Sequence, residues 1–301
     1  MLSLLRMRLR QAVDRHLSDH QSARATTVVD RVTAARGEQS ALAQTVQAIS
    51  IKRARKAIPF VYVCAIAHQL ATPSQSASLI ATQLVDMLLQ PLPMPEEGSL
   101  SDITVQATAT GLLKFELSDR AIAAWLDRLL AKALPQDLCV PLTSMERQMV
   151  LPTAAIFEVQ YAHARCCSLL RLAHSEGLIT LDRLDAAPLV WRVISPPAIP
   201  WLTSTAQFCL NHPADRQLLG HLVEASACLS DEAPCRRQQS LRSAQAIAQA
   251  MQVFHRVHPL WRKTGIEPNL VMLQLGLLLA TQRILYSLLV DGLDLDPVVE
   301  L

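Results

Sequence analysis

Between residues 157 and 171, five polar side chains recur at helical spacing: Gln160, Tyr161, Arg165, Ser168 and Arg171. At 100° per residue they fall on one side of a helix, and the apolar residues of the segment fall on the other side. An aromatic ring, two guanidinium groups and two uncharged hydrogen-bonding groups can stack on bases, contact phosphates and read base edges. The spacing therefore fits a surface for single-stranded RNA, and it also fits a solvated helix face that binds nothing.

The apolar side of the same segment contains Cys166, Cys167 and, at its edge, His163. Buried free cysteines generally behave as small apolar residues. A lone histidine beside an apolar face is more often a core residue than a ligand. We therefore expect these three side chains to pack in a core rather than to react or bind.

Other reactive groupings are missing from the sequence. Its seven cysteines form no CxxC pair and no Cys/His cluster with zinc spacing. No phosphate loop of the form GxxxxGKS or GxxxxGKT occurs, and no Ser–His–Asp set or carboxylate pair stands out. We therefore predict no catalytic residue, no metal site and no cofactor.

The composition is that of a folded and mainly helical chain. Of the 301 residues, 50% are hydrophobic and 18% are charged, which is enough apolar material for the cores of two domains. The small numbers of glycines (8) and aromatic residues (4%) favour helices over sheets. The net charge of +2 does not by itself indicate nucleic-acid binding, but 23 of the 28 cationic residues are arginine. Arginine suits phosphates and bases, and a GC-rich coding bias produces the same enrichment.

The densest positive cluster consists of Lys52, Arg53, Arg55 and Lys56. Such a cluster can grip a phosphate backbone. A run of solvated charged residues just before a buried apolar segment explains the cluster equally well, so both interpretations stay open.

Periodicity and turn signals divide the chain into elements. In the first half they predict helices over 2–17 and over 76–90, the latter with a serine at its start. They also predict strand–turn–strand over 103–119, where Leu113, Phe115 and Leu117 alternate in the second strand, and a helix from Ser118-Asp119 to just before Pro135. In the second half they predict helices over 154–174, 212–229, 240–263 and 268–290. Pro259 should break the third of these at His258, and the prolines of 187–202 make that stretch irregular.

The sequence predicts a soluble, cytoplasmic protein with no membrane partner. Arg6, Arg8 and Arg10 interrupt the apolar run at the N-terminus, so it lacks the core of a signal peptide. The longest apolar runs, near 58–67 and 270–280, are about half the length of a membrane span.

Four segments, in order along residues 155–290, resemble the anticodon-binding domain of arginyl-tRNA synthetases, known as the DALR domain. They are VQYAHAR with SLLR (159–171), HP with DRQLL (212–219), FHR (254–256) and LLLAT with IL (277–285). In the first half, GLLKFELSDRAIAAWLDRLL (111–130) resembles a strand and helix of that family's small N-terminal domain, which touches the elbow of the tRNA.

The resemblance implies a mainly α fold, in which a small α+β N-terminal domain precedes an all-α anticodon-binding helix bundle. We place the synthetase-like N-terminal domain at 1–134, a linker at 135–153 and the bundle at 154–301. The family's ATP-using domain has no counterpart, because no HIGH-type or KMSKS-type motif occurs. A doubly wound nucleotide fold also needs several βαβ units of about 30 residues each. The family name would be arginine–tRNA ligase, but we expect the chain itself not to be an enzyme.

The resemblance also implies which residues contact tRNA: Gln160, Tyr161, Arg165, Ser168, Arg171, His255, Arg256, Arg283, Lys52, Arg53, Arg55 and Lys56. The last helix departs from the family pattern. Gln282-Arg283 reverses the family's order, and Ser287-Leu288 stands where the family has Asn-Gly. These changes weaken any carry-over of specificity for an arginine anticodon.

The leading hypothesis is a non-catalytic tRNA-binding protein, built from the tRNA-contacting domains of an arginyl-tRNA synthetase. Its partners would be tRNA, with arginine tRNA among the candidates, and a separate tRNA-modifying or synthetase chain. One alternative is an accessory part of arginine–tRNA ligase, which supports arginyl-tRNA aminoacylation by a separate catalytic chain. Another is a protein-interaction module that has lost RNA binding.

Overall fold

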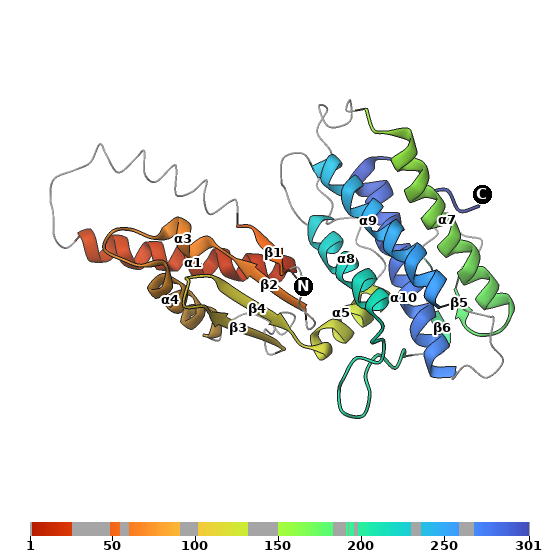
Figure 1. Cartoon of the computed structure of the whole chain (residues 1–301), viewed down its shortest axis with the longest axis horizontal. Coiled ribbons are helices and arrows are strands. Elements are labelled where there is room, and N and C mark those ends of the chain that lie inside the picture. The colour runs from red at the N-terminus through yellow and green to blue at the C-terminus, as the bar shows by residue number, and fades with distance from the viewer. Residues whose placement is uncertain are drawn as a thin grey trace. The chain divides into compact units, whose positions relative to one another are not determined.

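The computed structural model describes residues 2–25, 49–54, 60–90, 102–131, 150–182, 191, 193–195, 198–229, 236–258 and 268–300. The chain divides into two compact units, Ser3–Ala121 and Met1–Leu2 with Ile122–Leu301. The first combines helices with a four-stranded sheet, and the second consists mainly of helices (Figure 1). This confirms the predicted fold class. The family assignment of each domain stays a prediction, and most of the predicted linker lies outside the described residues.

The first unit contains an antiparallel sheet with the strand order β1-β2-β4-β3. Its strands are β1 (Ile51–Arg53), β2 (Phe60–Cys64), β3 (Ile103–Ala107) and β4 (Leu113–Leu117). Leu113, Phe115 and Leu117 are buried, and Phe115 lies between Tyr62 of β2 and Val105 of β3. This is the alternation of apolar residues that predicted the second strand of the 103–119 hairpin.

The sheet is accompanied by helices α1 (Leu2–Ala25), α3 (Ile66–Leu70) and α4 (Ala77–Leu89). Leu5, Leu9 and Val13 form a buried stripe along α1, and α4 packs against β3. The hydroxyl of Ser76 accepts the backbone N–H of Leu79 at 3.3 Å and so caps α4. The serine start that the sequence predicts for this helix is therefore confirmed.

The turn between β3 and β4 depends on a glycine. Gly111 has a φ of +84°, a left-handed conformation that other residues rarely adopt. A Cβ atom at this position would lie 2.6 Å from the Cβ of Ala77 at the start of α4. The turn and the first turn of α4 can therefore approach each other only because residue 111 has no side chain.

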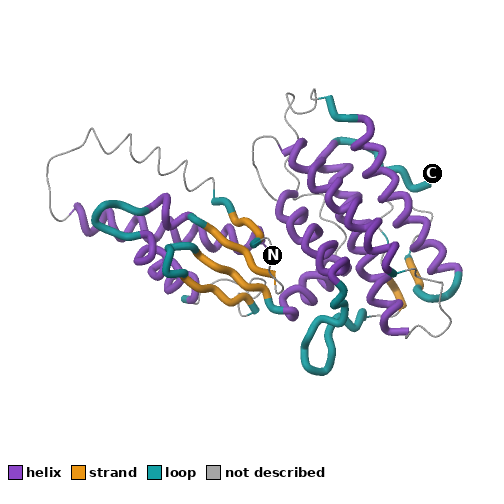
Figure 2. Tube along the Cα trace, in the orientation of Figure 1, coloured by secondary structure: helices purple, strands orange, loops and turns teal. Residues whose placement is uncertain are grey.

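The second unit contains most of α5 (Asp119–Ala131) together with α7 (Thr153–Ser175), α8 (Pro213–Leu229), α9 (Arg236–Val257), α10 (Pro268–Ser287) and a π-helical extension, η3 (Leu288–Gly292). Ser118 caps α5, since its hydroxyl accepts the N–H of Ala121 at 3.1 Å. Helix α10 packs against α7, α8 and α9, and Figure 2 shows it among the other helices of the bundle. It is the central helix of this unit.

Within the described ranges, one helical segment, Asn269–Gly292, is long and apolar enough to cross a membrane. Its most apolar window is 89% buried inside the structure, and it contains the buried polar residues Gln274, Gln282 and Arg283. A helix that is apolar on all sides is expected at the centre of a bundle. Its hydropathy is therefore explained by the core that it forms.

The second unit contains a short ribbon that was not predicted, and its third long helix, α9, ends where a proline was expected to break it. A short antiparallel ribbon pairs β5 (Thr180–Leu181) with β6 (Val193–Ser195), and such short strands leave no periodic signal in a sequence. Helix α9 spans Arg236–Val257, so the break expected at His258 is confirmed. The rest of the predicted helix over 240–263, after His258, lies outside the described residues.

Candidate nucleic-acid interface

Helix α7 exposes a stripe of side chains, here called the α7 stripe: Phe157, Tyr161, Arg165, Ser168 and Leu172. The spacing of four, four, three and four residues keeps them on one side of the helix. Phe157 is 62% exposed and Tyr161 is 42% exposed. Their rings stack on each other, with centroids 6.4 Å apart and planes inclined by 28°. Helix α7 therefore presents a pair of aromatic rings to solvent.

A cationic group lies one turn beyond this pair. The guanidinium of Arg165 donates a hydrogen bond to Nε2 of His255 on α9 at 3.4 Å, which joins the two helices at the surface. Arg256 is exposed on α9. The hydroxyl of Ser168 donates to the carbonyl of Ala164 at 3.0 Å and is exposed. The structure thus places Tyr161, Arg165 and Ser168 on one stripe, joins that stripe to His255, and leaves Arg256 exposed on the same helix as His255.

Two other predicted residues of α7 face a different partner. The side-chain amide of Gln160 donates to the carbonyl of Asp296 and accepts the N–H of Val298, both at 2.8 Å. The guanidinium of Arg171 donates to the carbonyl of Val299 at 3.3 Å and to the Glu300 carboxylate at 3.1 Å. The polar face of α7 is therefore divided between the open stripe and a second row that binds the C-terminal segment 294–300.

His163 holds the same segment from inside the core. Its Nδ1 donates to the carbonyl of Val298 at 2.8 Å, and its Nε2 accepts from the amide of Gln282 at 3.2 Å. The side chain is fully buried, and burial lowers its pKa below the usual 6.5. The expectation that His163 packs in the core is confirmed.

The stability of the protein should fall as the pH drops below about 6.5, in part because of His163. The unfolded chain takes up a proton at this residue near pH 6.5, whereas burial keeps it neutral in the folded state. One such group costs up to about 1.4 kcal/mol for each pH unit below 6.5, until the folded-state pKa is reached. Urea unfolding at pH 7.5, 6.5 and 5.5 should show a flatter profile for His163→Gln than for the wild type. Parallel profiles would mean that His163 does not stay neutral.

Cys166 and Cys167 lie behind the stripe and are buried. Burial raises both thiol pKa values, that of Cys167 to about 12. A thiol that is not ionised is a poor nucleophile and a poor metal ligand. The prediction that these cysteines pack rather than react agrees with this environment.

Arg283 is fully buried, although the family resemblance implies a role for it at the tRNA. Its Nε and Nη2 donate to the carbonyl of Trp191, and its Nη1 donates to the carbonyl of Leu129. A guanidinium with no exposed surface cannot touch RNA in this conformation. We therefore treat Arg283 as part of the bundle core and not as part of the interface.

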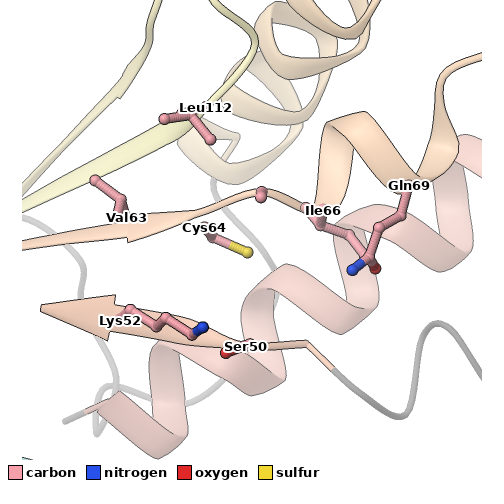
Figure 3. Close-up of a pocket in the computed structure, with 8 residues that line it drawn as sticks. Ser50, Lys52, Val63, Cys64, Ile66, Gln69 and Leu112 are labelled. Atoms are coloured by element: carbon pink, nitrogen blue, oxygen red, sulfur yellow. The ribbon is translucent and has the colours of Figure 1, made fainter.

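The basic cluster belongs to the first unit and is only partly described. Lys52 is exposed on β1. The guanidinium of Arg53 lies 4.7 Å from the ring centroid of Phe60. Arg55 and Lys56 lie outside the described residues. Figure 3 shows Lys52, Cys64 and Gln69 around a small cavity of about 200 Å³ at this end of the sheet.

Phe157 was not among the site residues predicted from the sequence. The available signal was a second aromatic ring four residues before Tyr161, since residues at this spacing meet on a helix surface. The close approach of His212, Asp215 and His258 was not predicted either, because Asp215 and His258 are 43 residues apart.

Comparison with known proteins links the chain to the aminoacyl-tRNA synthetases. One relative is the arginine–tRNA ligase of Gloeobacter violaceus, which is 25% identical over 230 residues. The alignment covers 75% of this chain and 35% of that protein, so the chain spans about a third of the length of its relative. Neither the known protein families nor the solved structures gave a match. The similarity supports the synthetase-like resemblance, and the assignment of a DALR domain stays a prediction.

Proposed function

We propose that this protein binds tRNA without aminoacylating it, and that it does so in the cytoplasm. The proposed contact surface, called the α7–α9 surface, consists of the α7 stripe with His255 and Arg256 of α9. The observation that carries the proposal is the exposed, stacked pair of Phe157 and Tyr161, with Arg165 one turn away. The similarity to an arginine–tRNA ligase supports tRNA as the class of RNA.

The chemistry of this surface suits unpaired nucleotides. A base that is turned out of its stack can lie on the aromatic pair, and the sequence of the base matters little for such stacking. The guanidinium groups of Arg165 and Arg256 can contact phosphates or the faces of bases. His255 orients Arg165 through their hydrogen bond. The anticodon loop is the part of a tRNA that offers such splayed bases.

We do not propose aminoacylation, because the described strands do not pair as a nucleotide-binding fold requires. The strands of the described ranges are antiparallel, both in the four-stranded sheet and in the ribbon. A doubly wound nucleotide fold requires parallel strands joined by helices. The sequence also lacks the ATP motifs of the arginyl-tRNA synthetase family that it resembles.

The double variant Tyr161→Ala/Arg165→Ala is expected to bind total tRNA at least about tenfold more weakly than the wild type. One base–aromatic stack contributes about 1–3 kcal/mol. The slope of log K against log salt should also become shallower, by about 0.7 for each phosphate that the variant no longer neutralises. Fluorescence anisotropy with labelled tRNA at several salt concentrations measures both quantities.

Arg128→Ala is the matched control, because Arg128 is an exposed arginine on α5, a helix that contributes no residue to the α7–α9 surface. It should bind tRNA as the wild type does. Equal affinity of the double variant and the control would place the contact elsewhere. A wild-type protein that shows no binding below about 10 μM at low salt, where phosphate contacts are strongest, would contradict the proposal itself.

An accessory role beside a separate catalytic chain is the second candidate. It is favoured by the similarity to a ligase of which this chain covers only 35%. In that case a synthetase chain should be recovered with the protein after nuclease treatment. Recovery of an unrelated protein that depends on the exposed apolar side chains of Phe157, Leu172 and Val257 would instead indicate an interaction module.

A further inference from the structure

Three side chains outside the α7–α9 surface converge where α8 begins and α9 ends: His212, Asp215 and His258. One potential ligand atom of each residue lies within 4.8 Å of the others. His212 precedes α8, Asp215 lies in its first turn, and His258 follows α9. The fold brings together two imidazoles and a carboxylate from two helices.

The carboxylate at the centre of this group is held in a fixed position. Asp215 is 2% exposed. Its Oδ2 accepts the backbone N–H of His212 at 3.2 Å, and its Oδ1 lies 2.6 Å from Nε2 of His258. The ring of His258 also packs against Phe254, with centroids 5.1 Å apart. Two of the three donors are thus positioned by the surrounding structure.

The third donor lies on the solvent side. The ring of His212 stands edge-on to that of His258, with centroids 5.5 Å apart. His212 is exposed, and its Nδ1 accepts the N–H of Ala214 at 3.1 Å. Solvent can therefore reach the group from the side of His212.

Part of this arrangement has a purely structural explanation. His212 and Asp215 cap the start of α8 reciprocally, as in a capping box, and this pairing needs no third residue. It does not account for His258, which arrives from another helix and places a nitrogen at hydrogen-bond distance from the same carboxylate. The cap therefore explains two residues, and the convergence of all three calls for a further reason.

We propose that His212, Asp215 and His258 bind a divalent transition-metal ion, with Zn²⁺ as the first choice. Two imidazole nitrogens and one carboxylate oxygen form a common donor set for zinc, cobalt and nickel. The ion replaces the hydrogen bond between Asp215 and His258, and the proton of that bond passes to solvent. His212 turns its exposed ring from the cap of α8 to the metal. Water completes the coordination, and the ion ties the start of α8 to the end of α9.

The proposal is tested with tag-free, metal-stripped full-length protein and Co²⁺ or Zn²⁺ as the probe. We expect one equivalent of Co²⁺ to give weak visible d–d absorption without the strong thiolate charge-transfer band that cysteine ligands would add. Zn²⁺ should remove this absorption. It should also raise the melting temperature by an amount that grows with its concentration, because it binds the folded state alone.

His258→Gln and His212→Gln should each lower the Zn²⁺ affinity at least tenfold and abolish the Co²⁺ spectrum. His221→Gln is the control, since His221 lies on the same helix α8 and pairs with Glu224 at 3.8 Å outside the group. Melting curves without metal show whether each variant is folded, and the exposed His212 makes its variant the safer of the two. Binding that survives in both variants, or a wild-type protein that gives no Co²⁺ spectrum, overturns the proposal.

Discussion

Replacing Arg283 with methionine is expected to lower the free energy of unfolding by about 3 kcal/mol, one of the two largest effects that we anticipate. Methionine keeps much of the apolar stem and removes the guanidinium. The carbonyls of Trp191 and Leu129 then lose the donors that Arg283 supplies. Each buried acceptor left without a donor costs about 1–3 kcal/mol. Urea unfolding followed by circular dichroism gives the difference directly.

Arg283→Lys serves as the comparison for this variant. Lysine keeps the charge but presents a compact ammonium in place of a planar fork of donors, so it cannot satisfy both carbonyls with the same geometry. We expect its stability to fall between those of the wild type and Arg283→Met. A loss below about 1 kcal/mol for Arg283→Met would show that the buried hydrogen bonds contribute little. It would also reopen the family-based role of this arginine.

The second large effect is expected at Gly276, in the middle of α10. A Cβ atom at this position would meet Cδ1 of Ile199 and would lie 2.7 Å from Cη2 of Trp201. The tryptophan cannot easily move. Its ring stacks on Phe208 with centroids 6.0 Å apart, and its indole N–H donates to Asp127 at 2.8 Å. Gly276→Val should therefore destabilise the protein by about 2–3 kcal/mol through overpacking.

Whether Gly276→Val raises or lowers the stability is informative, because a glycine inside a helix normally destabilises a protein by about 0.5–1 kcal/mol relative to alanine. Removing it would stabilise α10 if the space beside it were open. Thermal and urea unfolding of Gly276→Val measure the net result. Adding Ile199→Val removes the Cδ1 atom and should recover part of the loss, which a double-mutant cycle would reveal. A variant as stable as the wild type would mean that the loop carrying Trp201 is not packed on α10.

The elements with strong local signals could be predicted from the sequence. The apolar periodicity of α7, the alternation along β4 and the capping serine of α4 each depend on residues close together in the chain. The exposed position of Tyr161 and Arg165 could be predicted for the same reason. The partners of Gln160 and Arg171 could not, because they lie 128 to 138 residues away.

Arg283 shows how a family resemblance can conflict with a local pattern. It sits among apolar residues in a helix that is apolar on all sides, and this composition by itself indicates a core position. The resemblance favoured the surface instead. The group of His212, Asp215 and His258 had no signal at all, since metal-ligand spacing in a sequence is recognisable only when the ligands come from neighbouring turns or loops.

The contacts between α7 and segment 294–300 have a consequence for the protein while it is being made. Synthesis proceeds from the N-terminus, so α7 emerges from the ribosome more than 100 residues before the segment that covers one of its faces. During that interval Gln160 and Arg171 lack the backbone groups that they hold in the finished fold. A nascent chain therefore presents a different α7 to its surroundings than the mature protein does, and a chaperone or an RNA can meet that earlier form first.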